Sequence, residues 1–198
     1  MRNDFAVLIL SHGRADRVYT IPTLRKGGYT GKIYIVVDNE DEQQDEYIAR
    51  YGKENVIVFD KLEAMKHSDT MDNYEKHNIV LYARNSCFEI AKRLGLSSFL
   101  ELDDDTAFDF RFEKSGKLAA KHCTDFDRLF EAMLNFLYES DSLVVALSQG
   151  GDYIGGLNGK YFAKKLSRKA MNAFFCRVDR PFSFFGSINE DVNMYVTL

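Results

Sequence analysis

Residues 98–106, SFLELDDDT, decide the fold of this chain, because a short apolar run ends there in three carboxylates. A run this short, bounded by polar residues, indicates a buried strand, and open α/β sheets bind ligands at the carboxyl ends of their strands. On an extended backbone, Asp103 and Asp105 point to one side and Asp104 to the other. The triplet therefore predicts a site for Mg²⁺ or Mn²⁺, which take oxygen ligands, with a solvated acidic turn as the alternative.

Composition indicates one ordinary globular domain over residues 1–198, with 45% hydrophobic and 28% charged residues. The formal charge of −4 argues against nucleic-acid binding through bulk electrostatics, although a local basic patch remains compatible with it. Cys87, Cys123 and Cys176 are widely separated and have no metal-binding spacing, so we expect reduced, buried thiols. The first apolar run is too short for a signal peptide or a membrane span, which predicts a cytoplasmic protein.

The first third of the chain alternates strands and helices. Apolar runs predict strands at residues 5–10, 32–37 and 56–59. A first helix is predicted to be capped by Thr20 and stopped at Gly27-Gly28, and a second to cover 41–51 and close at Gly52. This β-α-β-α-β order predicts a mostly parallel sheet flanked by helices.

The remaining elements follow from the same patterns. Helical periodicity predicts a helix within 78–94 and another over 125–138 that is opened by Thr124. Alternating phenylalanines predict a strand over 108–112 with one apolar face, followed by a turn at Ser115-Gly116. Further buried strands are predicted at 143–147 and 173–178.

Polar side chains follow two of the predicted parallel strands. Ser11 and Arg14 come after the first strand and Asp38 after the second, where the sheet forms its ligand crevice. Ordinary turn chemistry is the alternative interpretation of these residues. Arg84 and Asn85 fall near the start of the helix predicted within 78–94, where a helix end and an arginine can meet an anion. The alternative interpretation is that Arg84 and Asn85 are ordinary polar residues on the protein surface.

Two later segments admit two interpretations each. The glycine-rich residues 149–159 match neither the P-loop nor the GxGxxG pattern; they predict close backbone approach to a bulky polar ligand or simply a mobile loop. Residues 160–169 are basic and predict a contact to a phosphate-bearing partner or a solvated charge run.

The order of these motifs resembles that of GT-A glycosyltransferases over nearly the whole chain. The motifs are Ser-x-x-Arg, a strand ending in Asp38, a helix with Arg84-Asn85, the acidic triplet, Gly155-Gly156 and Asn189-Glu190-Asp191. The glycine loop and the segment FGSINEDVN are similar to the phage-encoded glycosyltransferases associated with TET/JBP-type base hydroxylases. The resemblance implies a Rossmann-like, mostly parallel GT-A sheet.

The resemblance also implies a role for each site residue. Asp103 would meet the ribose or the metal shell, and Asp105 would bind Mn²⁺ or Mg²⁺ at the diphosphate of a nucleotide sugar, such as a UDP-sugar. The predicted nucleotide pocket comprises Ser11, Arg14, Asp38, Arg84, Asn85 and Asp104. Gly155 and Gly156 would lie along the donor sugar. Asp191, with Glu190 beside it, would be the general base; the alternative is an acidic first helical turn.

The implied function is metal-dependent transfer of a sugar from a nucleotide donor to an acceptor hydroxyl, with a hydroxylated base in phage DNA as the narrower acceptor. The protein would then work in the host cytoplasm. The alternatives are a non-catalytic nucleotide-binding module and a nucleotidyltransferase. GT-A enzymes commonly continue beyond the Glu-Asp motif with a metal-binding histidine, so the resemblance predicts either water at that position or a truncated chain. Oligomeric state is left open.

Overall fold

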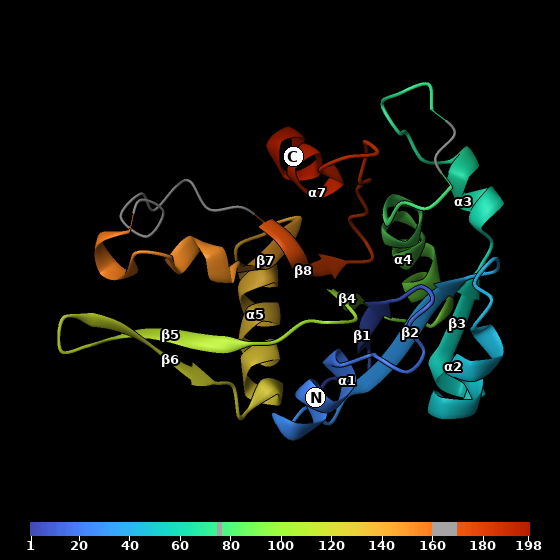
Figure 1. Cartoon of the computed structure of the whole chain (residues 1–198). Coiled ribbons are helices and arrows are strands. Elements are labelled where there is room, and N and C mark those ends of the chain that lie inside the picture. The colour runs from blue at the N-terminus through green and yellow to red at the C-terminus, as the bar shows by residue number, and fades with distance from the viewer. Residues whose placement is uncertain (75–76, 160–169) are drawn as a thin grey trace.

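A computed structural model describes residues 1–74, 77–159 and 170–198 of the chain, and the basic run 160–169 lies outside these residues. Within the described residues, six strands form one sheet in the order β3-β2-β1-β4-β8-β7 (Figure 1). Their bounds are Phe5–Leu10 for β1, Lys32–Asp38 for β2, Val56–Phe59 for β3, Ser98–Asp103 for β4, Val144–Ser148 for β7 and Ala170–Arg177 for β8.

The sheet is mostly parallel, as predicted. Strand β1 pairs in parallel with both β2 and β4, and β2 pairs in parallel with β3. Strand β8 runs antiparallel to β4 and to β7. The carboxyl ends of β1, β2, β3 and β4 therefore meet at the same edge of the sheet.

The central strand β1 is buried on both faces, because its six consecutive apolar residues alternate between two cores. Phe5, Val7 and Ile9 belong to one core, which the helices α1 (Thr20–Lys26), α2 (Gln44–Tyr51) and α5 (Phe126–Glu139) complete. The alternate side chains of β1 belong to the other core, with α3 (Lys61–Lys66), α4 (Leu81–Arg93) and α7 (Glu190–Thr197). The result is a sheet between two helical layers.

Two predicted helix caps are wrong. The residue that caps α5 is Asp125, whose carboxylate accepts from the Arg128 amide at 3.1 Å, rather than Thr124. Thr20 is the first residue of α1 and not its cap. Its hydroxyl instead donates to the Asp103 carbonyl at 2.7 Å. The threonine thus anchors the end of β4, a role that local sequence does not reveal.

The other elements follow the predictions with several differences. Helix α2 begins at Gln44 rather than at residue 41, and strand β6 (Lys117–His122) was not predicted. Helix α3 was not predicted, because six residues are too few to show a period. Strand β7 is only half-buried, since it lies at the edge of the sheet. Short 3₁₀ turns, η1 (Lys53–Asn55), η2 (Gly150–Tyr153) and η3 (Gly156–Asn158), complete the described chain. Across the described ranges, no helix has the length and apolar character needed to cross a membrane.

A hairpin projects away from the main sheet (Figure 1). Its strands are β5 (Asp109–Lys114) and β6 (Lys117–His122), and we call residues 109–122 the arm. Ser115 and Gly116 both have positive φ, 54° and 73°, which is the backbone of a tight hairpin turn. All six residues of β5 are exposed, so of the predicted apolar face only Phe108, which precedes the strand, packs against a core.

Candidate functional site

A pocket of about 450 Å³ lies at the carboxyl ends of the parallel strands, and we call it the strand-end pocket. The start of α4 forms its other wall. The pocket brings together six of the residues predicted from the sequence: Ser11, Arg14, Asp38, Asp103, Asp104 and Asp105. Side chains that are far apart in the chain therefore share one crevice, as the strand order requires.

Asp104 is the buried member of the acidic triplet. Its carboxylate accepts from Ser11 Oγ at 2.6 Å and from Arg14 Nη1 at 2.9 Å, and the charge of Asp104 raises the pKa of Arg14. The prediction that Asp104 lies opposite Asp103 and Asp105 assumed an extended backbone, which the structure shows only as far as Asp103. Strand β4 ends at Asp103, and Asp104-Asp105 form a turn, so the strand alternation stops there and all three line the same pocket.

Asp103 and Asp105 flank this buried carboxylate. The Asp103 side chain is 31% exposed and Asp105 is an exposed residue. The Thr20 hydroxyl, bound to the Asp103 carbonyl, also accepts from the Thr106 amide at 2.8 Å, which fixes the turn from behind. The carboxylates of Asp103 and Asp105 thus border the pocket on a segment whose backbone is hydrogen-bonded to Thr20.

The chemistry of these donors fits a hard cation only in part. Within residues 1–74, 77–159 and 170–198, no cluster of three His, Cys, Asp or Glu side chains has the geometry of a metal site. Mg²⁺, however, is commonly held by one or two carboxylates, with substrate phosphates and water completing its shell. Asp103 and Asp105 match that pattern, in which the substrate supplies the remaining oxygen ligands.

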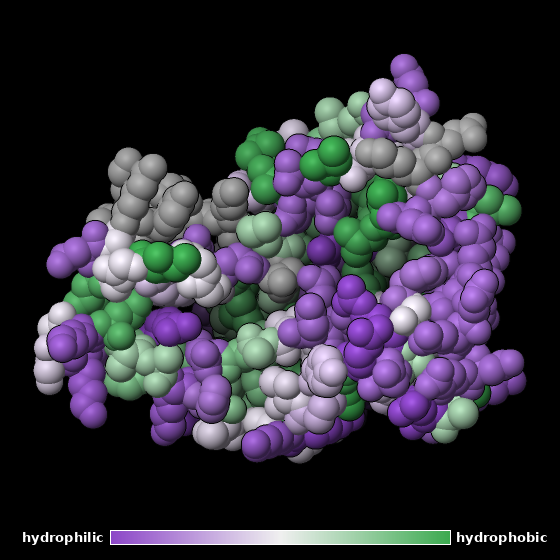
Figure 2. All heavy atoms as spheres, viewed as in Figure 1, coloured by the Kyte–Doolittle hydropathy of each residue, from purple (hydrophilic) through white to green (hydrophobic). Residues whose placement is uncertain are grey.

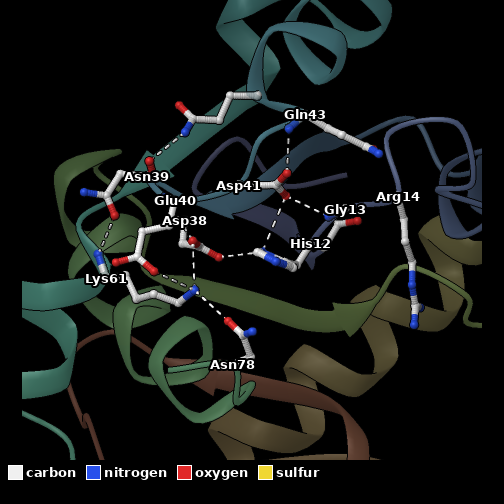
Figure 3. A network of polar contacts seen from close by, with 12 residues as sticks. His12, Gly13, Arg14, Asp38, Asn39, Glu40, Asp41, Gln43, Lys61 and Asn78 are labelled. Carbon is white, nitrogen blue, oxygen red and sulfur yellow. Dashed lines mark hydrogen bonds and ion pairs between the residues drawn. The ribbon is translucent and has the colours of Figure 1, made fainter. Parts of the chain in front are cut away.

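A second polar network surrounds Asp38 (Figure 3). The Asp38 carboxylate contacts Lys61 Nζ at 3.1 Å and His12 Nδ1 at 2.8 Å. Burial raises the pKa of this carboxyl, but the contacts with Lys61 and His12 outweigh burial and hold the pKa below its ordinary value. Lys61, itself buried, also donates to Asn78 Oδ1 at 3.3 Å and lies 3.3 Å from Glu40 Oε2.

His12 and Lys61 line the strand-end pocket but were not predicted as site residues. The available signal was their position: His12 directly follows β1, as Ser11 does, and Lys61 comes two residues after β3. The conformation of the loop that carries His12 is fixed by Asp41, whose carboxylate accepts from the Gly13 amide at 2.8 Å (Figure 3). Gly13 has a φ of 62°, which favours glycine there.

A buried charge cluster lies behind the acidic turn. Arg84 on α4 donates to Glu101 at 2.5 Å and to Glu190 at 3.1 Å, and its guanidinium lies 3.6 Å from Asp103. The rings of Phe174 and Phe184 lie 5.4 and 5.6 Å from the guanidinium. Burial raises the pKa of Glu101 to about 7, although Arg84 opposes the shift.

Arg84 and Asn85 are therefore engaged within the protein. Arg84 connects three acidic side chains and does not line the strand-end pocket. The Asn85 amide donates to Ser68 Oγ and to the Phe184 carbonyl, both at 3.0 Å, and accepts from the Phe184 amide at 2.8 Å. Asn85 thus fastens the segment before α7 to α4.

Glu190 and Asp191 form the first turn of α7, which is the alternative that the sequence had left open. Asp191 is buried, and its carboxylate accepts from the Val192 amide at 2.7 Å. Neither residue lines the strand-end pocket. Glu190 is nonetheless connected to Asp103 through Arg84, so the start of α7 is linked to the acidic turn.

Gly155 directly precedes η3 and Gly156 is its first residue, and η3 lies against β6 rather than against the strand-end pocket. Their φ angles are 89° and 64°, in the region that glycine adopts most readily. A Cβ at Gly155 would lie 2.9 Å from the Cα of Gly159. The turn itself therefore accounts for these glycines.

The fold and the strand-end pocket define a mixed α/β protein with an acidic pocket at the ends of its parallel strands. The family model of TET-associated glycosyltransferases matches residues 5–198, and the chain belongs to that family. The resemblance seen in the sequence is thereby confirmed. Family membership implies an enzyme that moves a sugar from a donor to an acceptor. A search of curated proteins returned no match to the chain.

Proposed function

We propose that this protein is a metal-dependent glycosyltransferase of the GT-A type that transfers a sugar from a nucleotide sugar, such as a UDP-sugar, to a hydroxyl on a modified DNA base. The observation that supports this proposal is the strand-end pocket, where six side chains from three strand ends converge. Its volume of about 450 Å³ is within the range typical of small-molecule sites.

Asp103 and Asp105 are the residues that would hold Mn²⁺ or Mg²⁺. Such a cation neutralises negative charge on the diphosphate of a nucleotide donor. The acidic turn would already have the required shape, since Thr20 and Thr106 fix its backbone and Asp104 fixes it to Ser11. Preorganised charges stabilise a transition state without the cost of rearrangement during the reaction.

The other pocket residues would bind the nucleotide. Arg14 is half-exposed and only partly neutralised by Asp104, so its guanidinium can also face an anionic diphosphate. Asp38, supported by His12 and Lys61, would accept hydrogen bonds from ribose hydroxyls or the base. We assign Gly155, Gly156 and Asn85 to shaping the fold around this site.

In the proposed transfer, the acceptor oxygen bonds to the anomeric carbon while the bond from that carbon to the diphosphate oxygen breaks. The nucleoside diphosphate leaves, and the hydroxyl proton passes to a carboxylate. We propose Asp191 as that base and Glu190 as the side chain that, through Arg84, couples its helix to the acidic turn. A general base must come within hydrogen-bond distance of the acceptor hydroxyl.

A non-catalytic nucleotide-binding module is the second candidate. The specific observation in its favour is that Glu190 and Asp191 do not line the strand-end pocket. Both candidates predict nucleotide binding at the same residues. They differ in turnover, because only the enzyme cleaves the bond between sugar and diphosphate.

A hydrolysis assay over a panel of sugar nucleotides with Mn²⁺ tests the proposal. We expect slow Mn²⁺-dependent release of nucleoside diphosphate by the wild type, and a loss of about 100-fold in Asp105→Ala, the scale of one electrostatic contact to a transition state. Asp45→Ala, an exposed aspartate on α2, is the matched control. Binding without turnover would favour the non-catalytic module, and pyrophosphate release from a nucleoside triphosphate and a sugar phosphate would indicate a nucleotidyltransferase.

A further inference from the structure

A second pocket, of about 310 Å³, lies between the arm and the start of the glycine-rich loop, and we call it the arm pocket. One wall comes from the segment entering β5 and from β5 itself. The opposite wall comes from the end of β7 and from η2. Figure 2 shows apolar side chains beside polar ones over this part of the molecule, at the left of the view. None of the site residues predicted from the sequence lines it.

A smaller hollow of about 170 Å³ borders both pockets. It shares Asp105 with the strand-end pocket and Ala107, Phe108 and Ser148 with the arm pocket. Phe108 follows Asp105 by three positions. Three residues of extended chain span at most about 11 Å, so the Cα atoms of Asp105 and Phe108 lie within that distance. A group in the arm pocket can therefore reach a donor held at the acidic turn.

The lining of the arm pocket combines aromatic faces with hydrogen-bonding groups. Phe108, Phe110 and Tyr153 contribute rings, and Ser148 and Arg111 contribute polar atoms. The Tyr153 hydroxyl is hydrogen-bonded to Ser148, and the Arg111 guanidinium lies 5.8 Å from the centre of the Tyr153 ring. Such a set suits a flat ring with polar edges, as a nucleobase has.

The charge of the arm supports a nucleic-acid partner. Its fourteen residues, 109–122, include the basic side chains Arg111, Lys114, Lys117 and Lys121 and only two acidic ones, in a chain whose formal charge is −4. The local positive charge stands beside the pocket, because Lys121 is the cross-strand neighbour of Phe110. Backbone phosphates of DNA bind to such exposed lysines and arginines.

We propose that the arm pocket receives the acceptor base, taken out of the DNA stack, and directs its hydroxyl through the smaller hollow toward the donor. Enzymes that modify a base inside a duplex extrude it into a pocket and hold it by stacking and edge hydrogen bonds. This inference rests on the proposed function, since it names the place of the acceptor in the same transfer.

The arm supplies a matched pair of variants. Phe110 and Phe112 lie on the same strand, two residues apart, and are 46% and 42% exposed, but only Phe110 lines the arm pocket. The probe is a fluorescent oligonucleotide with one 5-hydroxymethylpyrimidine, and fluorescence anisotropy gives its affinity. We expect Phe110→Ala to weaken binding about 5-fold or more, the scale of one base–aromatic stack. Phe112→Ala should change it less than about twofold.

An abasic oligonucleotide sharpens this test. With no base to stack, wild type and Phe110→Ala should bind it equally, and Tyr153→Ala should behave like Phe110→Ala. Equal effects of Phe110→Ala and Phe112→Ala on the modified probe would overturn the inference, as would a wild type that does not bind it. Donor hydrolysis by the wild type, measured without DNA, is a separate readout: its absence would contradict the proposed function and not the location of the base.

Discussion

The strand-end pocket and the arm pocket differ in how far their side chains are buried and bound to other residues of the protein. Around the strand-end pocket, Asp104 and Asp38 are buried and each contacts at least two partners. In the arm, every residue of β5 is exposed, and Phe110 is nearly half-exposed. A preorganised site suits a small charged ligand, whereas an exposed arm suits a large partner that completes its contacts on binding.

The largest difference in stability should come from replacing Arg84, in the charge cluster behind the acidic turn. Arg84→Met leaves Glu101, Asp103 and Glu190 without their shared cation. Removing one partner of a buried ion pair costs about 3 to 5 kcal/mol, so we expect that loss in the free energy of unfolding, measured by denaturant titration.

The control for Arg84 is Arg50, which forms an exposed pair with Glu46 on α2. Arg50→Met should change the free energy of unfolding by less than about 1 kcal/mol. If both variants had the same small effect, the charge cluster behind the acidic turn would not be a structural support of the site.

The next effect separates two adjacent aspartates. Asp104→Ala removes a buried carboxylate that binds Ser11 and Arg14, and should cost about 1 to 2 kcal/mol of unfolding free energy. Asp105→Ala changes an exposed side chain and should cost less than about 0.5 kcal/mol. Thermal unfolding with matched protein concentrations compares them. Equal stabilities of the two variants would contradict the distinction between Asp104, which supports the fold, and Asp105, which faces the ligand.

Acid should weaken the network around Asp38. Because its folded-state pKa lies below its ordinary value of 3.8, the carboxylate adds stability that is fully present above pH 3.8 and is lost as the pH falls through the folded pKa. The stability gap between wild type and Asp38→Asn should therefore shrink from pH 6 to about pH 3. Urea titrations at both pH values measure the gap, and a gap that grows toward acid would show that the pKa of Asp38 is raised rather than lowered on folding.

The smallest effect is expected in the arm. Phe112→Ala alters an exposed ring that covers no core, so its free energy of unfolding should stay within about 0.5 kcal/mol of the wild type. Phe130→Ala, at a fully buried position in α5, is the contrast and should cost about 3 to 5 kcal/mol. A large loss in Phe112→Ala would show that the arm packs against the body more tightly than its exposure indicates.

Much of the strand-end pocket could be predicted from sequence, because parallel strands converge at their carboxyl ends. Apolar runs located β1, β2 and β4, and the polar residues that follow each run share the pocket. The partners of these residues could not be predicted in the same way. Thr20 contacts Asp103 across 83 positions, and the contact of Lys61 with Asp38 depends on the order of β2 and β3.

The sequence was least informative where one residue type serves two purposes. Arg84 fits an anion site at a helix start, but a glutamate within the apolar run of β4, Glu101, binds it instead. Gly155 and Gly156 fit a ligand loop, yet positive φ angles already require glycine there. The arm pocket was not predicted, because its walls come from β5, β7 and η2, which no local pattern brings together.

Calorimetric titration of UDP into the protein, with and without Mn²⁺, tests the central claim most directly: the acidic turn seats a cation against a nucleotide diphosphate. We predict binding that depends on Mn²⁺ and falls at least about tenfold in Asp105→Ala, equivalent to about 1.4 kcal/mol, while Asp45→Ala binds as the wild type does. UDP binding that is absent, or equally strong without Mn²⁺ and in Asp105→Ala, would contradict the account.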